Sequence, residues 1–170
     1  MDRRAFVASS VGLAAAGAAF AAEQPSLRSR LLGVWSLTDA VTITENVIAP
    51  WSGRQTPISG ILIYLDSGWM SVQIAGAKPG TISRVDFGKL STTDRFVWLK
   101  EYYAYYGMFE IDELASVVTH RLTDSLFPYE KDAILKRRFE LQEGILTLLT
   151  EPREEGGRSV VNRLVWKKIA

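Results

Sequence analysis

Most of this chain alternates between apolar and polar residues with a period of two, which limits the folds open to it. A period of two puts successive side chains on opposite faces of a strand, so it indicates β-strands with one buried face. Short turn signals such as Asp66-Ser67-Gly68 and Glu143-Gly144 separate the alternating segments. We expect eight strands, at residues 33–44, 58–65, 68–75, 105–112, 115–123, 133–142, 145–151 and 159–168.

Short connections between successive strands favour an antiparallel sheet whose strands follow one another in sequence order. Eight such strands can close into an up-and-down barrel, which leaves no exposed sheet edge. The predicted fold class is therefore all-β, an antiparallel up-and-down β-barrel of about eight strands with one helix between the third and the fourth. A barrel of this size is either filled by its own side chains or holds one small ligand.

The segment between the third and fourth strands has a helical period instead. Ser91, with an acidic residue three positions later, forms a capping-box-like start. Phe96, Leu99 and Tyr103 then fall at positions i, i+3 and i+7, which makes one apolar stripe. Alternation resumes at Tyr105. We therefore expect a helix from Ser91 to about Tyr103, with Phe96 and Tyr103 covering one end or one side wall of the barrel.

The N-terminus has the order of an export signal. Arg3 and Arg4 precede an uncharged run rich in Ala, Gly and Ser at residues 6–21, and Ala19-Phe20-Ala21 fits an A-x-A cleavage site. The run is shorter than a bilayer-spanning helix, so a retained membrane anchor is the less favoured interpretation. The arginine pair resembles a twin-arginine signal. We expect residues 1–21 to be removed, the mature chain to begin at Ala22, and the protein to reach the periplasm or be secreted.

The composition of the remaining residues 22–170 excludes several function classes. Once residues 1–21 are removed, 18 of the 20 basic and 18 of the 19 acidic residues remain, so the formal charge is zero and we expect no nucleic-acid partner. These 149 residues suit a single domain. The absence of cysteine excludes disulfides, thiolate metal sites and cysteine nucleophiles. With a single histidine and no phosphate-binding loop or HExxH motif, we expect neither a metal nor a cofactor.

Several segments, taken in order, resemble the bacterial and fungal lipocalin-like domain family. They are LLGVWSL at 31–37, GILIYLDSGWMSVQI at 60–74, YAYYGMFEIDE at 103–113, VVTHRLTDSLFP at 117–128, RRFELQEGILTLLT at 137–150 and RLVWKK at 163–168. The resemblance implies a calycin-type barrel. Some fungal relatives are thought to act on polyketide-like skeletons as cofactor-free isomerases or cyclases, but the family offers no catalytic motif to carry over to this chain.

The pair Gly33-x-Trp35 is also similar to the wider lipocalin signature, in which the tryptophan closes the base of the barrel. In lipocalins an arginine of the last strand packs on this tryptophan. The resemblance therefore implies that Arg163 lies against Trp35.

His120 and Arg137 are the candidate catalytic residues. Alternation puts His120 on the inward face with Val118 and Leu122, where it is either a hydrogen-bonded interior histidine, which we favour, or a ligand contact or general acid–base. Arg137 shares the apolar face of its strand with Phe139. An unpaired buried guanidinium is costly, so Arg137 must pair with a protein carboxylate, the favoured case, or meet an acidic ligand.

Four further side chains are candidate ligand contacts, namely Tyr64, Gln73, Tyr105 and Phe109. Both faces of the strand that carries Gln73 are plausible inward sets. Trp51 lies in the long loop segment 45–57, where it is either a lid or a side chain tucked over the barrel end. So many aromatic residues leave little free volume, so we expect a small cavity for a flat ligand.

Three functional hypotheses follow. The favoured one is an exported barrel that binds a small hydrophobic or aromatic ligand. The second is a cofactor-free isomerase or cyclase that uses the same cavity. The third is a barrel packed solid, whose outer surface makes protein contacts.

Overall fold

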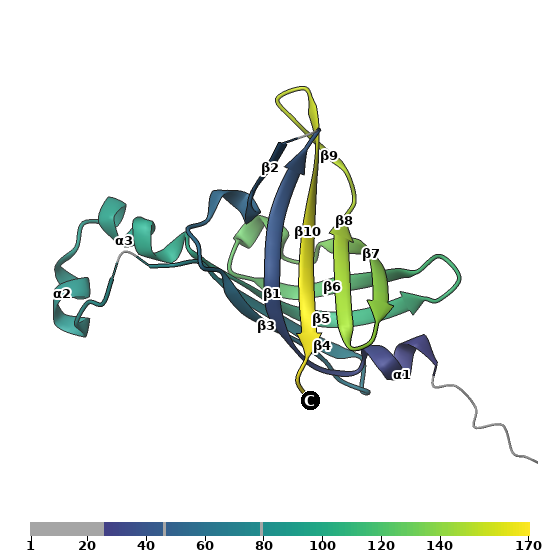
Figure 1. Cartoon of the computed structure of the whole chain (residues 1–170). Coiled ribbons are helices and arrows are strands. Elements are labelled where there is room, and N and C mark those ends of the chain that lie inside the picture. The colour runs from purple at the N-terminus through teal and green to yellow at the C-terminus, as the bar shows by residue number, and fades with distance from the viewer. Residues whose placement is uncertain (1–25, 46, 79) are drawn as a thin grey trace, which may run out of the picture.

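The computed structural model describes residues 26–45, 47–78 and 80–170, and in these residues one antiparallel sheet closes on itself (Figure 1). The predicted export signal and its cleavage site lie outside the described residues. The sheet order is β2-β1-β3-β4-β5-β6-β7-β8-β10-β9, and pairing of β1 with β10 closes the barrel. Its eight staves are β1 (Gly33–Thr44), β3 (Ser59–Tyr64), β4 (Trp69–Ala75), β5 (Tyr102–Asp112), β6 (Val117–Ser125), β7 (Ile134–Gln142), β8 (Ile145–Thr150) and β10 (Arg158–Lys168). The predicted fold class is confirmed.

Two short strands extend the rim beyond this barrel, in segments whose sequence indicates loops. β2 (Val47–Pro50) pairs with the end of β1, and β9 (Arg153–Glu155) pairs with the start of β10. Both are exposed throughout, so they have no buried face and their sequences carry no alternation. Their backbones are paired because β1 and β10 are longer than the other staves around them.

The segment between β4 and β5 holds two short helices, α2 (Arg84–Lys89) and α3 (Thr92–Leu99). The predicted cap of α3 is confirmed, because Ser91 Oγ accepts a hydrogen bond from the Asp94 backbone N–H at 3.1 Å. The prediction that this helix continues to Tyr103 is wrong. β5 already pairs with β4 from Tyr102 onward, and Tyr103 lies buried in the barrel wall.

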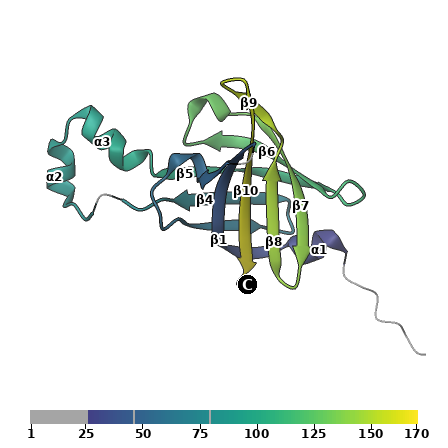
Figure 2. The ribbon, with the colours of Figure 1, turned by 45° about the horizontal axis from the view of Figure 1, so that its top comes forward.

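The position of α3 also differs from our expectation. Figures 1 and 2 show α2 and α3 projecting away from the barrel, and the Phe96 side chain is 60% exposed. The apolar stripe therefore does not cover the barrel end.

In the described part of the chain, no helix combines the length and the apolar character needed to cross a bilayer.

The end of the barrel opposite β2 and β9 is packed closed around Trp35. The helix α1 (Leu27–Leu31) lies across it, and the Leu31 carbonyl accepts a 2.9 Å hydrogen bond from Trp35 Nε1. The cation over the Trp35 ring is Lys168, at 5.4 Å from the centroid. The expected contact with Arg163 is wrong, because Arg163 faces outward and pairs with Asp39 at 3.2 Å. Alternation along β10 explains this result, since the even-numbered residues face inward.

The facing of the other strands follows the period of two. Trp35, Tyr64, Tyr105 and Phe109 all point into the barrel, as predicted, and each is at most 6% exposed. The open question about β4 is also decided. Its even-numbered residues are buried, and Gln73 lies on the outer face, where it accepts a 2.8 Å hydrogen bond from the Tyr102 hydroxyl.

Candidate ligand-binding site

A cavity of about 580 Å³ occupies the half of the barrel next to β2 and β9. Just over half of its lining residues are aromatic or aliphatic, among them Trp51, Ile74, Tyr103, Phe127, Leu148 and Trp166, and the others are polar or charged. Pockets for drug-sized ligands usually measure about 300–1,000 Å³. Within the described residues the barrel is therefore hollow at one end, and the alternative in which side chains fill it throughout is wrong.

The cavity is larger than we expected because the interior aromatic residues are divided between the two halves. Tyr64 and Phe109 pack on each other in the closed half, with 4.6 Å between ring centroids, and neither lines the cavity. Tyr103 and Tyr105 stand in the cavity wall instead of crossing the lumen.

Trp51 is held in one wall by a cation and an amide. It lies in the short 3-10 helix η1 (Trp51–Gly53) and is 6% exposed, so it is tucked into the barrel end. The Arg54 guanidinium lies over its ring at 4.2 Å. Asn162, with its amide oxygen toward the cavity, accepts from Trp51 Nε1 at 3.3 Å and from an Arg153 N–H at 3.1 Å. Its NH₂ group donates to Thr42 at 2.8 Å.

Arg54 is a buried cation in this wall. It is 8% exposed, and no carboxylate lies within 4.0 Å of it in the described residues. Burial lowers the pKa of Arg54, and the charge of Glu101 opposes that shift. Glu101, itself 2% exposed, accepts a 2.9 Å hydrogen bond from the Gln55 backbone N–H. The Arg54 guanidinium therefore lies among aromatic side chains, and its N–H groups remain available for a hydrogen bond to a ligand.

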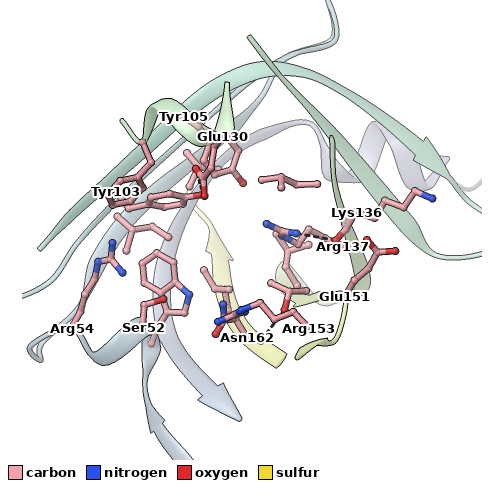
Figure 3. A pocket seen from close by; sticks show the side chains of 18 of the residues that line it. Ser52, Arg54, Tyr103, Tyr105, Glu130, Lys136, Arg137, Glu151, Arg153 and Asn162 are labelled. Carbon is pink, nitrogen blue, oxygen red and sulfur yellow. Dashed lines mark hydrogen bonds between the residues drawn. The ribbon is translucent and has the colours of Figure 1, made fainter. Parts of the chain in front are cut away.

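Arg137 enters the cavity from β7. Figure 3 shows its guanidinium reaching inward while the neighbouring Lys136 points away. The guanidinium donates a hydrogen bond to the Lys136 carbonyl at 2.9 Å, and among the described residues no carboxylate is within 4.0 Å of it. The favoured expectation of a protein carboxylate partner is thus wrong, because the acidic residues of the cavity wall lie beyond salt-bridge distance.

His120 lies behind the cavity wall and is fully buried. Its Nε2 is 2.7 Å from the Tyr64 hydroxyl, and its Nδ1 is 2.9 Å from the Tyr105 hydroxyl. Burial, with a smaller contribution from the positive charge of Arg137, lowers the pKa of His120 well below its ordinary value. His120 is therefore a neutral, hydrogen-bonded interior residue that reaches the cavity only through Tyr105.

Glu130 is an acidic residue of the cavity wall and lies beside Tyr103 and Tyr105. Glu130 accepts hydrogen bonds from the Tyr103 hydroxyl at 3.0 and 3.2 Å and from Ser125 Oγ at 2.7 Å. Figure 3 shows Glu130 next to Tyr103 and Tyr105, on a different side of the cavity from Arg137. Burial is the main reason that the pKa of Tyr103 is raised, and the Glu130 charge adds to the effect.

Of the six predicted ligand contacts, the structure brings Tyr105 and Arg137 to the cavity. Tyr64, Phe109 and His120 form a buried layer behind them, and Gln73 lies outside the barrel. In the described part of the chain, no three His, Cys, Asp or Glu side chains converge in the way a metal site requires.

Comparison with known proteins shows which family the chain belongs to. The model of the family described as "Lipocalin-like domain" matches residues 32–169. The chain belongs to this family. A comparison with curated proteins found no match. A solved structure titled "REP1-NXSQ fatty acid transporter" is similar at 12% identity and a TM-score of 0.37, over 84% of this chain and 98% of that one.

Sequence reasoning missed several residues of this lipocalin-like barrel's site. Arg54, Glu130 and Arg153 come from connections and from a rim strand, where no alternation indicates which side chains point inward. Asn162 was not missed, because the sequence indicates it as a polar group that could enter the barrel, and the parity of β10 puts it on one face with Leu164 and Trp166.

Proposed function

We propose that this protein binds a small, mainly apolar ligand with one acidic or carbonyl group in the barrel cavity. The observation that carries the proposal is a hollow of about 580 Å³ whose aromatic and aliphatic walls also present the Arg54 and Arg137 guanidinium groups. Burying about 300 Å² of apolar ligand surface contributes roughly 7.5 kcal/mol before association costs. A charge-assisted hydrogen bond to a guanidinium adds to this, so we expect micromolar affinity.

Three matched probes test the proposal by equilibrium dialysis. 2-Naphthoate carries a carboxylate, 2-acetonaphthone carries a neutral carbonyl group, and naphthalene carries no polar atom. We expect 2-naphthoate to bind most tightly and naphthalene least. If none of the three is retained near its solubility limit, ligand binding in this cavity is refuted for compounds of this shape.

The role of Arg137 in this binding is tested with Arg137→Met, which keeps much of the side-chain length but removes the charge. Loss of a charged hydrogen bond should weaken 2-naphthoate binding by roughly tenfold or more and leave naphthalene unchanged. Arg138→Met is the matched control, because Arg138 is the next residue of β7 and faces outward. Equal losses in both variants would contradict a specific role for Arg137.

A cofactor-free isomerase or cyclase is the second candidate function. The observation that favours it is that Glu130, a carboxylate able to accept a proton, shares the cavity wall with the Tyr105 hydroxyl. Such an enzyme would remove a proton next to a carbonyl group. Incubation with 2-acetonaphthone in D₂O, followed by NMR, should then show deuterium entering the methyl group faster than in buffer. Exchange that is unchanged in Glu130→Gln, or absent from the wild type, contradicts this candidate.

Export is also part of the proposal. The support is Arg3-Arg4 ahead of the small-residue run and the Ala19-Phe20-Ala21 site. N-terminal sequencing of the periplasmic fraction of a bacterial host should read from Ala22. A cytoplasmic chain that keeps residues 1–21 would refute export.

A further inference from the structure

His120 bridges two tyrosine hydroxyls inside the barrel, Tyr64 at Nε2 and Tyr105 at Nδ1. The ring is fully buried and close to the positive Arg137, so it is neutral. A neutral imidazole has a single N–H, so it donates a hydrogen bond to one hydroxyl and accepts one from the other. The position of that proton decides which tyrosine keeps a free O–H.

Tyr64 decides the position of the proton. The residue is 1% exposed, and in the described part of the chain its hydroxyl has His120 Nε2 as its single hydrogen-bond partner. If Nε2 carried the proton, the buried Tyr64 O–H would have no acceptor, and an unsatisfied buried polar group is strongly disfavoured. When Nε2 is unprotonated, it accepts the Tyr64 O–H. The proton of His120 therefore lies on Nδ1.

The position of the His120 proton determines the orientation of the Tyr105 O–H. Nδ1–H donates to the Tyr105 oxygen at 2.9 Å, and the Arg137 guanidinium lines the same cavity. The O–H of Tyr105 must then point away from the His120 ring. Glu130, on the same wall, already accepts from Tyr103 and Ser125, and none of the described residues accepts a hydrogen bond from Tyr105 into the cavity.

We propose that Tyr64 and His120 act as positioning residues that orient the Tyr105 O–H into the cavity as a hydrogen-bond donor. The donor and the Arg137 guanidinium line the same cavity, and together they select a ligand that carries an oxygen acceptor, a carboxylate or a carbonyl. This inference rests on the proposed binding function and names the chemical group that the cavity recognises. Tyr64 thus determines specificity although it does not line the cavity.

The first test reads the proton directly and needs no ligand. The chain has one histidine, so the ¹⁵N signals of His120 are unambiguous in protein without a histidine tag. A long-range ¹H–¹⁵N spectrum at pH 7.5 should show a pyrrole-type, protonated Nδ1 and a pyridine-type, unprotonated Nε2. A protonated Nε2 would overturn the inference.

The second test measures selectivity with the naphthalene probes. Tyr105→Phe removes the donor, and Tyr64→Phe frees Nε2, so that His120 can carry its proton there and accept the Tyr105 O–H at Nδ1. Tyr105→Phe should weaken 2-acetonaphthone binding by roughly two- to tenfold, the effect of one neutral hydrogen bond. Tyr64→Phe leaves the buried Nε2 without a partner in either tautomer, so the proton is shared between Nδ1 and Nε2 and binding should weaken by about twofold. Naphthalene binding should be unchanged in both variants. Tyr106→Phe, on the outer face of the same strand as Tyr105, is the control and should change neither.

The outcomes separate this inference from the proposed function. Equal affinity of Tyr64→Phe and wild type for 2-acetonaphthone would overturn the positioning role. If Tyr64→Phe fails to fold, the tautomer measured in the wild type still supports or overturns the inference. If the wild type binds none of the probes, the ligand proposal fails, while the tautomer still decides how the Tyr105 O–H is oriented.

Discussion

The Arg54 guanidinium lies over the indole ring of Trp51, with 4.2 Å between its central carbon and the ring centroid. A guanidinium is planar and weakly hydrated, so it can stack on an aromatic ring in a buried setting where an ammonium group would lose more hydration. This contact fixes one wall of the cavity. It comes from the connection between β2 and β3, not from a barrel stave.

Replacing Arg54 by Lys should therefore destabilise the protein although the charge is kept. Stacking on tryptophan contributes about 0.5–2 kcal/mol, so we expect Arg54→Lys to lower the melting temperature by about 2–6 °C. Differential scanning calorimetry measures the change. Arg84→Lys, an exposed site in α2, is the control, and an equal melting temperature for the two variants would contradict the contact's contribution.

Gly76 should not tolerate a side chain. A Cβ at this position would overlap the Glu101 carboxylate and come too close to the Gln55 carbonyl, and both groups belong to the same hydrogen-bonded junction. We expect Gly76→Ala to lower the free energy of unfolding by about 1–3 kcal/mol in urea titrations.

Gly88 is the matched control for this substitution. It lies in α2 with open space around it, so Gly88→Ala should be neutral or stabilise the helix by up to about 1 kcal/mol. Similar destabilisation by both substitutions would show that the tight contact at Gly76 is not the cause.

The two projecting helices should be dispensable for the stability of the barrel. No residue between 80 and 99 is buried. The pairing of β4 with β5 already reaches the pair Ala75–Tyr102, where the connection that holds the helices begins and ends. Replacing residues 80–99 by Gly-Ser-Gly should change the melting temperature by less than about 2 °C, since little apolar surface is lost from the core. A fall of more than about 5 °C would mean that the helices contribute to barrel stability.

Stability should depend on pH through His120. Its pKa is well below 6.5 in the folded chain, so between about pH 6.5 and 5 the unfolded chain binds a proton that the folded chain does not. The free energy of unfolding therefore falls as the pH falls through this window, by up to about 1.4 kcal/mol per unit.

His120→Gln tests this dependence. The variant should melt at a lower temperature than wild type at pH 7.5, because glutamine cannot satisfy both tyrosine hydroxyls. Its melting temperature should also change less between pH 6.5 and 5, because the titrating group is gone. The same pH slope in both proteins would show that other groups cause the loss of stability in acid.

By itself the sequence determined the barrel and the facing of most of its staves, with β4 left open. Alternation is a local property, since each residue of a strand takes the face opposite its neighbours, so the period of two alone places Tyr64, Phe109 and His120 inside the barrel. Alternation along β10 also places Arg163 on the outer face of the barrel. The family resemblance implied instead that Arg163 packs against Trp35, and that expectation was wrong.

Only the tertiary structure decided where the barrel is hollow and which polar groups meet there. The cavity wall combines Arg54, Glu130, Arg137 and Asn162, which come from two connections and two strands far apart in the sequence. No local period relates such positions, because their distances depend on how the staves tilt and where each connection turns back over the rim. The length of α3 was decided in the same way, since pairing of Tyr102 with Ala75 ends the helical stripe that the residues alone would continue.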